Sequence, residues 1–197
     1  GRNKGDSMLY HASSVAGLTE LRPHISNHGI PLLYFSQKRE NTLVYLSNAV
    51  EKFCRETGFI HHGVWKKWGP YGFTAEGLQR LEEYYPNALE ETYRGVSGYI
   101  YTVEKVLRRG YPVDIPGTVT SRGAVPVAGC EFIPDAWEAI LQAEQAGLLV
   151  LRRYGEASEK ERQWLYMTVR EEYRQAEDHP EYRHFLRAKF DIDPDTL

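Results

Sequence analysis

The segment from Val96 to Ile133 constrains the fold of this chain more than any other. Its first part, VSGYIYTVEKV, is rich in the Tyr, Ile, Val and Thr residues that favour β-strands. From Pro112 to Pro134 the recurring Pro and Gly residues predict short strands joined by tight turns, and residues 125–133 are the most strand-like part. Helical patterns do not alternate regularly with these strands. The sequence therefore predicts an α+β fold and disfavours a doubly wound parallel sheet.

Length and composition favour one globular domain. The chain has 197 residues, enough to bury a core without disulfides or metals, and we expect one domain over residues 8–197. Residues 1–7, GRNKGDS, are polar and are predicted to be a disordered leader or a tag remnant. A net charge of −3 with no basic block disfavours non-specific nucleic-acid binding. The apolar runs are too short to span a bilayer, and two cysteines make the cytoplasm the simplest compartment.

Apolar spacing and capping signals predict the remaining elements. Apolar residues at spacings of three and four predict one helix after Ser36 with a buried stripe. Ser158 and Glu161 match a capping box, which predicts a helix to about Ala176, the first of the C-terminal helices at about residues 158–190. The buried stripe consists of Leu43, Leu46, Val50 and Phe53. The other predicted elements are strands at 8–11, 31–35 and 148–151, an ordered aromatic loop or hairpin at 59–73, and helices at 76–85, 134–147 and 181–189.

The common catalytic and nucleotide-binding motifs are absent from the sequence. It contains no P-loop, G-x-G-x-x-G loop, H-E-x-x-H helix or nucleophile elbow. The adjacent His61 and His62 lack a third ligand at a usual spacing, so no metal site is predicted. What remains is His11 and Tyr34 on short strands, with a hydroxyl residue and a second tyrosine downstream. Such a set could hold a flat heteroaromatic amide.

Three segments of the chain, in order, resemble the motifs of the ADP-ribosyltransferase superfamily. The likeness is to its His-Tyr-Glu group, which includes poly(ADP-ribose) polymerases and diphtheria-type toxins. LYHAS at residues 9–13 is similar to the first motif, His-Gly-Ser or His-Gly-Thr, with Ala12 where glycine is usual. In GIPLLYFSQKRENTLVYLS at residues 29–47, Tyr34 ends a strand, and Thr42 and Tyr45 stand for the Ser-x-x-Tyr of the second motif. CEFIPD at residues 130–135 is similar to the third, a glutamate on a strand.

The resemblance implies a split β-sandwich that forms an NAD cleft, with flanking and C-terminal helices. It also implies a mono-ADP-ribosyltransferase, or an NAD hydrolase, with NAD as substrate. Glu131 would be the catalytic carboxylate, aimed at the positive charge that develops on the ribose. His11 would bind the adenosine-side ribose. The other implied NAD contacts are the nicotinamide-stacking Tyr34 and Tyr45, and Ala12, Ser13 and Thr42 around the carboxamide.

Several alternatives stay open at this point. Glu104, at the end of YIYTVE, competes with Glu131 for the catalytic role. The acceptor can be a protein, a nucleic acid or a small molecule. A non-catalytic module that binds ADP-ribose, NAD or a peptide would use the same cleft. An RNA 2′-phosphotransferase-like enzyme would need basic residues around it, for which Arg22, Arg39 and Arg122 are the candidates. The sequence does not predict the oligomeric state.

Overall fold

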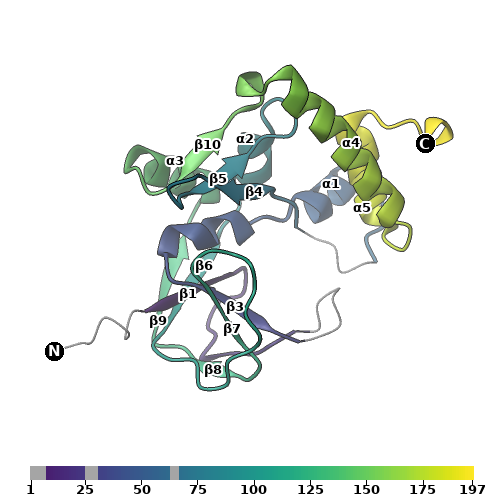
Figure 1. Ribbon diagram of the computed structural model, residues 1–197. Coiled ribbons are helices and arrows are strands. Elements are labelled where there is room, and N and C mark those ends of the chain that lie inside the picture. Colours follow the sequence, from purple (N-terminus) through teal and green to yellow (C-terminus); the bar gives the residue numbers. More distant parts are fainter. Residues whose placement is uncertain (1–7, 25–30, 63–66) are drawn as a thin grey trace. The chain divides into compact units, whose positions relative to one another are not determined.

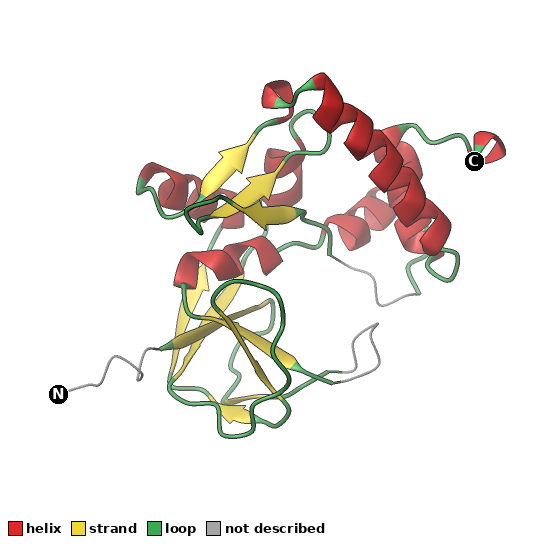
Figure 2. Cartoon of the chain, viewed as in Figure 1, coloured by secondary structure: helices red, strands yellow, loops and turns green. Residues whose placement is uncertain are grey.

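A computed structural model describes residues 8–24, 31–62 and 67–197 (Figure 1). The chain forms two compact units, each built from two segments. The first unit contains Gly1–Leu46 and Gly95–Leu149, and the second contains Ser47–Arg94 and Val150–Leu197. Strands dominate the first unit and helices the second (Figure 2).

The first unit is built on a five-stranded antiparallel sheet with the strand order β7-β3-β1-β6-β9. A two-stranded antiparallel sheet, β2-β8, belongs to the same unit. The strands are β1 (Leu9–Ser13), β2 (Glu20–Leu21), β3 (Leu33–Ser36), β6 (Gly98–Val103), β7 (Thr118–Ser121), β8 (Val125–Pro126) and β9 (Gly129–Ile133).

The two faces of the five-stranded sheet pack differently. One face buries an apolar cluster that includes Phe35 and Tyr101, together with Leu21 and Val125 from β2 and β8. The 3₁₀ helix η1 (Arg39–Tyr45) packs on β1 and β3, and α3 (Ala136–Gln145) contacts η1. A methyl group at Gly98 in β6 would lie 2.5 Å from the Leu46 side chain, so the segment just after η1 packs directly on the sheet backbone.

The second unit joins a three-stranded sheet to a helical core. β5 pairs in parallel with β10 and antiparallel with β4. Val50, Phe185 and Leu186 are among the fully buried residues of the helical core. The elements of the unit are α1 (Ala49–Thr57), β4 (Tyr71–Phe73), β5 (Gln79–Glu82), α2 (Ala88–Tyr93), β10 (Val150–Arg152), η2 (Tyr154–Glu156), α4 (Glu159–Gln175), α5 (Pro180–Phe190) and η3 (Pro194–Thr196).

The predicted α+β class is confirmed, as are several elements. Ser158 caps α4 in a complete capping box with Glu161. The helix predicted at 134–147 is present as α3, which begins two residues after Pro134 and ends two residues before Gly147. Leu43, Leu46 and Val50 are buried as predicted, whereas Phe53 is half-buried. The chain packs as two compact units, and the single domain predicted over residues 8–197 stays a prediction. The predicted leader at 1–7 and part of the aromatic loop, 63–66, lie outside the described residues.

Two predicted helices are wrong. The single helix after Ser36 is two helices, η1 and α1, because the buried Ser47 between them donates to the carbonyl of Trp68 at 2.7 Å. The predicted helix at 76–85 contains the strand β5. Leu81 in β5 is fully buried, and its backbone pairs with β4 and β10. Pairing with strands distant in sequence overrides the local helical pattern there.

Candidate functional site

The three segments that carry the motif-like residues belong to one sheet. β1 contains His11, Ala12 and Ser13, and its neighbour β3 contains Tyr34. β9 contains Glu131 and is joined to β1 through β6. η1, which follows β3, contributes Thr42 and Tyr45. The first unit therefore holds every predicted site residue.

The junction between β1 and β3 is short. Tyr10 and Ser36 are its one register pair within the described strands, whereas β1 pairs with β6 over five positions and β3 with β7 over four. Next to this pair, the His11 side chain also joins β1 to β3, because its Nδ1 lies 2.8 Å from the carbonyl oxygen of Tyr34. Because a carbonyl can only accept, Nδ1 carries the proton and donates. In a neutral ring Nε2 is then a hydrogen-bond acceptor.

Strand register distributes the predicted residues over the two faces of the sheet. Ala12 pairs with Ile100, and Ile100 pairs with Glu131, so these three side chains share one face. Tyr10 is two residues from Ala12 and shares its face, and so does Ser36, which pairs with Tyr10. Tyr34 is two residues from Ser36 and therefore lies on this face too. His11 alternates to the other face, where its ring packs 5.7 Å from that of Phe35. The structure thus brings Glu131 to the Tyr34 side of the sheet, and His11 approaches Tyr34 from the opposite side.

Glu131 is held by an arginine of the second motif-like segment. Arg39 in η1 donates from Nε and Nη2 to the two carboxylate oxygens of Glu131, at 2.7 and 2.8 Å. Arg39 Nη1 also lies 3.5 Å from a carboxylate oxygen of Glu40. The hydrogen bonds and charge of Arg39 lower the pKa of Glu131, although burial opposes them. Glu131 is therefore a fixed carboxylate, ionised at neutral pH, with about half of its side chain exposed.

The residues of η1 differ in access. Thr42 is buried, and its hydroxyl donates to the Arg39 carbonyl at 2.8 Å. Tyr45 is 38% exposed. Ser13, at the end of β1, accepts from the amide of Val15. Tyr45 is accordingly the η1 residue with a surface open to stacking.

Tyr34 has a partner that sequence reasoning missed. Burial raises the pKa of Tyr34, and the charge of Tyr111 together with a side-chain hydrogen bond to it raises this pKa further. Tyr34 therefore stays neutral and keeps a flat, uncharged ring. Neither Tyr111 nor Arg39 lies near its partner in sequence. The sequence indicates Arg39 only as a basic residue for an RNA substrate, and its pairing with Glu131 follows from the position of η1 over the sheet.

The alternative residues are placed as follows. Glu104 is exposed, directly after β6, and forms no hydrogen bond or ion pair with the residues that the structure describes. Arg22 pairs with Glu20, and Arg122 donates from Nε to the Arg109 carbonyl at 3.0 Å. Arg39 is engaged by Glu131. The three arginines considered for an RNA substrate each therefore have a partner within the protein.

The comparisons with known proteins add no relative. No family model, curated protein or solved structure matches this chain.

Over residues 8–24, 31–62 and 67–197, His, Cys, Asp and Glu side chains form no group of three that could hold a metal. None of the helices in the described part of the chain is both long and apolar enough to cross a membrane.

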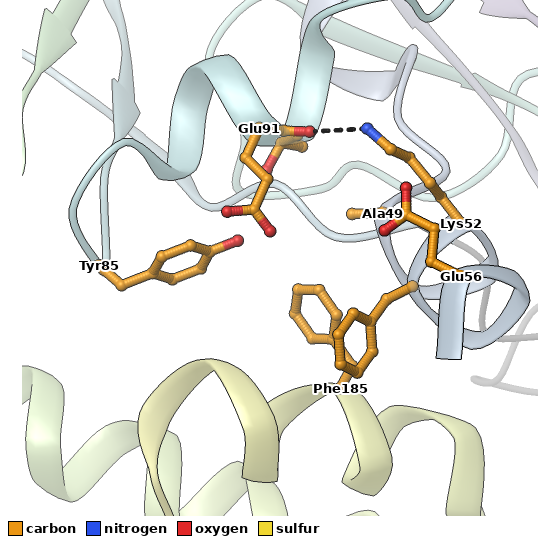
Figure 3. A pocket seen from close by; sticks show the side chains of 8 residues that line it. Ala49, Lys52, Glu56, Tyr85, Glu91 and Phe185 are labelled. Carbon is orange, nitrogen blue, oxygen red and sulfur yellow. Dashed lines mark hydrogen bonds between the residues drawn. The ribbon is translucent and has the colours of Figure 1, made fainter. Parts of the chain in front are cut away.

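A small pocket in the second unit is filled by its own polar contacts. It has a volume of about 190 Å³, between α1, α2 and α5. Lys52 donates to the backbone carbonyl of Glu91 at 3.2 Å, and the Glu91 carboxylate points toward the Tyr85 hydroxyl (Figure 3). Lys189 also pairs with this carboxylate and lies over the Tyr85 ring. Because these groups satisfy one another in a volume below the usual ligand range, we assign no site here.

Proposed function

We propose that the first unit binds NAD and transfers its ADP-ribose moiety to an acceptor, or to water when no acceptor is bound. The observation that supports this most is that an ionised Glu131 shares one sheet face with Tyr34 and Ala12. These residues come from three distant segments; Tyr34 and Glu131 match residues of the His-Tyr-Glu motifs, and Ala12 stands where the first motif usually has glycine. The short β1–β3 junction is consistent with the split sheet that the resemblance implies.

The chemistry asks for few groups. The bond between the ribose C1′ and the nicotinamide nitrogen breaks, its electron pair leaves with neutral nicotinamide, and an acceptor then attacks C1′ and loses a proton. Positive charge grows on the ribose in the transition state, so the Glu131 carboxylate would stabilise it. The Tyr34 and Tyr45 rings would orient the planar leaving group by stacking.

NAD binding and turnover test the proposal. Calorimetric titration should show saturable NAD binding, and nicotinamide should be released over time. Tyr34→Ala should weaken binding about tenfold, because it removes a stacking surface. Tyr166→Ala, at an exposed tyrosine of the second unit, is the matched control and should bind as the wild type does. If millimolar NAD neither binds to the protein nor releases nicotinamide, the proposal is wrong.

One observation favours a second candidate, a non-catalytic module that binds ADP-ribose. His11 and Glu131 lie on opposite faces of the sheet, and the carboxylate is already paired with Arg39. A site that only binds would need the rings and the His11 nitrogen, and no free carboxylate. Saturable binding of ADP-ribose without any nicotinamide release from NAD distinguishes this candidate from the enzyme.

A further inference from the structure

A larger pocket lies in the second unit, between the sheet β4-β5-β10 and the first turns of α4. Its volume is about 450 Å³, within the range of about 300 to 1,000 Å³ typical of sites for small molecules. Its lining comes from all three strands and from α4, together with Tyr84 just after β5. No part of the proposed NAD site contributes to it.

The floor of this pocket is an ordered row of charges. The Glu82 carboxylate, 9% exposed, accepts from Nε of Arg80 at 2.6 Å and pairs with Arg152. Arg152 also pairs with Glu161 in the first turn of α4. A guanidinium carries five N–H donors, so both arginines keep donors beyond these bonds. Glu82 thereby fixes the guanidinium groups of Arg80 and Arg152 at the wall of the pocket.

Lys160 adds a third cation to the pocket. It forms no hydrogen bond or ion pair with any residue in the described part of the chain, and it lies on the pocket wall. The carboxylates on the wall, Glu82 and Glu161, are both used by the arginines. The pocket therefore has an excess of positive charge and a lysine available for an anion.

An aromatic wall faces these cations. Trp164 in α4 lines the pocket and is 55% exposed, although large aromatic side chains usually bury most of their surface. The Tyr84 ring meets Trp164 edge-on, with centroids 6.3 Å apart and planes at 88°. With the planes nearly perpendicular, Tyr84 can cover at most one face of the indole ring, and at least one face is left uncovered by it. A flat ring system can stack there.

We propose that this pocket binds a mononucleotide, with its base on Trp164 and its phosphate on Lys160 and Arg80. Base stacking on an aromatic side chain and charge-assisted hydrogen bonds to phosphate are the two contacts that the wall offers. The site is independent of the proposed NAD-dependent activity, because it lies wholly in the second unit.

Calorimetry with AMP as the probe tests this proposal, with ribose 5-phosphate and adenosine as its two halves. We expect AMP to bind saturably and more tightly than either half. Lys160→Ala and Trp164→Leu should each weaken AMP binding about tenfold. Matched controls on the same helix are Arg174→Ala and Tyr166→Leu, which lie outside this pocket and should bind AMP as the wild type does.

The opposite outcomes are clear. If AMP does not bind, or if Lys160→Ala and Trp164→Leu bind it unchanged, the charged row only holds α4 to the sheet and the proposal is wrong. If Tyr34→Ala abolishes AMP binding and Trp164→Leu does not, AMP occupies the first unit and the proposal also fails. Nicotinamide release from NAD is a separate readout, so either proposal can fail while the other stands.

Discussion

At the scale of single residues, the pair of Arg39 and Glu131 determines how the candidate site behaves. Two hydrogen bonds fix the carboxylate and hold its pKa below the ordinary glutamate value. Both side chains are substantially exposed, so the pair contributes at most about 1 kcal/mol to the free energy of unfolding. The pair therefore matters more for the charge and orientation of the Glu131 carboxylate than for the stability of the fold.

Arg39→Gln should raise the pKa of Glu131 toward the ordinary glutamate value of about 4.3, because it removes the bonds and charge that favour the carboxylate. Carboxyl NMR titration measures this pKa without relying on any activity. Arg22→Gln, at an exposed arginine paired with Glu20, is the control and should leave it unchanged. An unaltered Glu131 titration in Arg39→Gln would mean that the two side chains are not paired in solution.

Sequence reasoning could name the residues of the site but not their partners. His11, Tyr34 and Glu131 were selected by local motifs, which depend on neighbours in sequence. The bonds of Glu131 to Arg39 and of Tyr34 to Tyr111 join residues far apart in the chain. The opposite placement of His11 and Glu131 depends on the register of three strands, which no local pattern specifies.

At the scale of elements, the capping box of α4 was predictable because it is local. Ser158 accepts from the amide of Glu161 at 3.2 Å, and the Glu161 side chain accepts from the amide of Ser158 at 3.3 Å. The structure has β5 in place of the helix predicted at 76–85, and two helices in place of the one predicted after Ser36. Both differences depend on contacts with residues distant in sequence. Local signals thus predicted helix ends well and strand partners poorly.

Ser158→Ala should lower the free energy of unfolding by about 1 kcal/mol, because it removes the bond to an otherwise unpaired amide of the first helical turn. Urea denaturation followed by helical circular dichroism measures this. Ser14→Ala, at an exposed serine outside any helix, should change stability little. Equal stability of Ser158→Ala and the wild type would indicate that the first turn of α4 is frayed.

The contact between α1 and α5 contains a histidine with a pH-dependent effect. The His184 ring stacks on Phe59 at 4.3 Å, and its Nε2 lies 2.8 Å from the Thr57 hydroxyl. Burial lowers the pKa of His184, and the nearby charge of Arg187 lowers it further. The unfolded chain, with an ordinary histidine pKa of about 6.5, therefore takes up this proton more readily than the folded chain.

The wild type should consequently lose stability as the pH falls through about 6.5 toward the lowered pKa of His184. His184→Gln should be less stable at neutral pH, since it loses the stacking on Phe59, and its stability should depend less on pH in this window. Urea denaturation at several pH values gives both slopes. His62→Gln, at an exposed histidine, should keep the wild-type slope, and a wild-type slope in His184→Gln would contradict the account.

At the scale of the whole molecule, the order of strand-like and helical segments in the sequence predicts an α+β fold, and the structure agrees. The structure forms two compact units, each of which combines an early and a late segment. The chain crosses between them near Leu46, Arg94 and Leu149, at positions without a linker-like composition. Charge and hydropathy averages over the whole chain could not reveal this division, because such averages do not depend on the order of the residues.

The central claim is that Glu131 stabilises the transition state for nicotinamide release. The most direct measurement compares Glu131→Gln with the wild type in NAD affinity and in the rate of nicotinamide release. Gln keeps the shape and deletes the charge, so the rate should fall about 100- to 1,000-fold while the NAD dissociation constant changes less than about tenfold. Glu138→Gln, at an exposed glutamate of α3, should keep the wild-type rate. Full activity of Glu131→Gln would contradict the claim, and its loss in Glu104→Gln instead would assign the role to that residue.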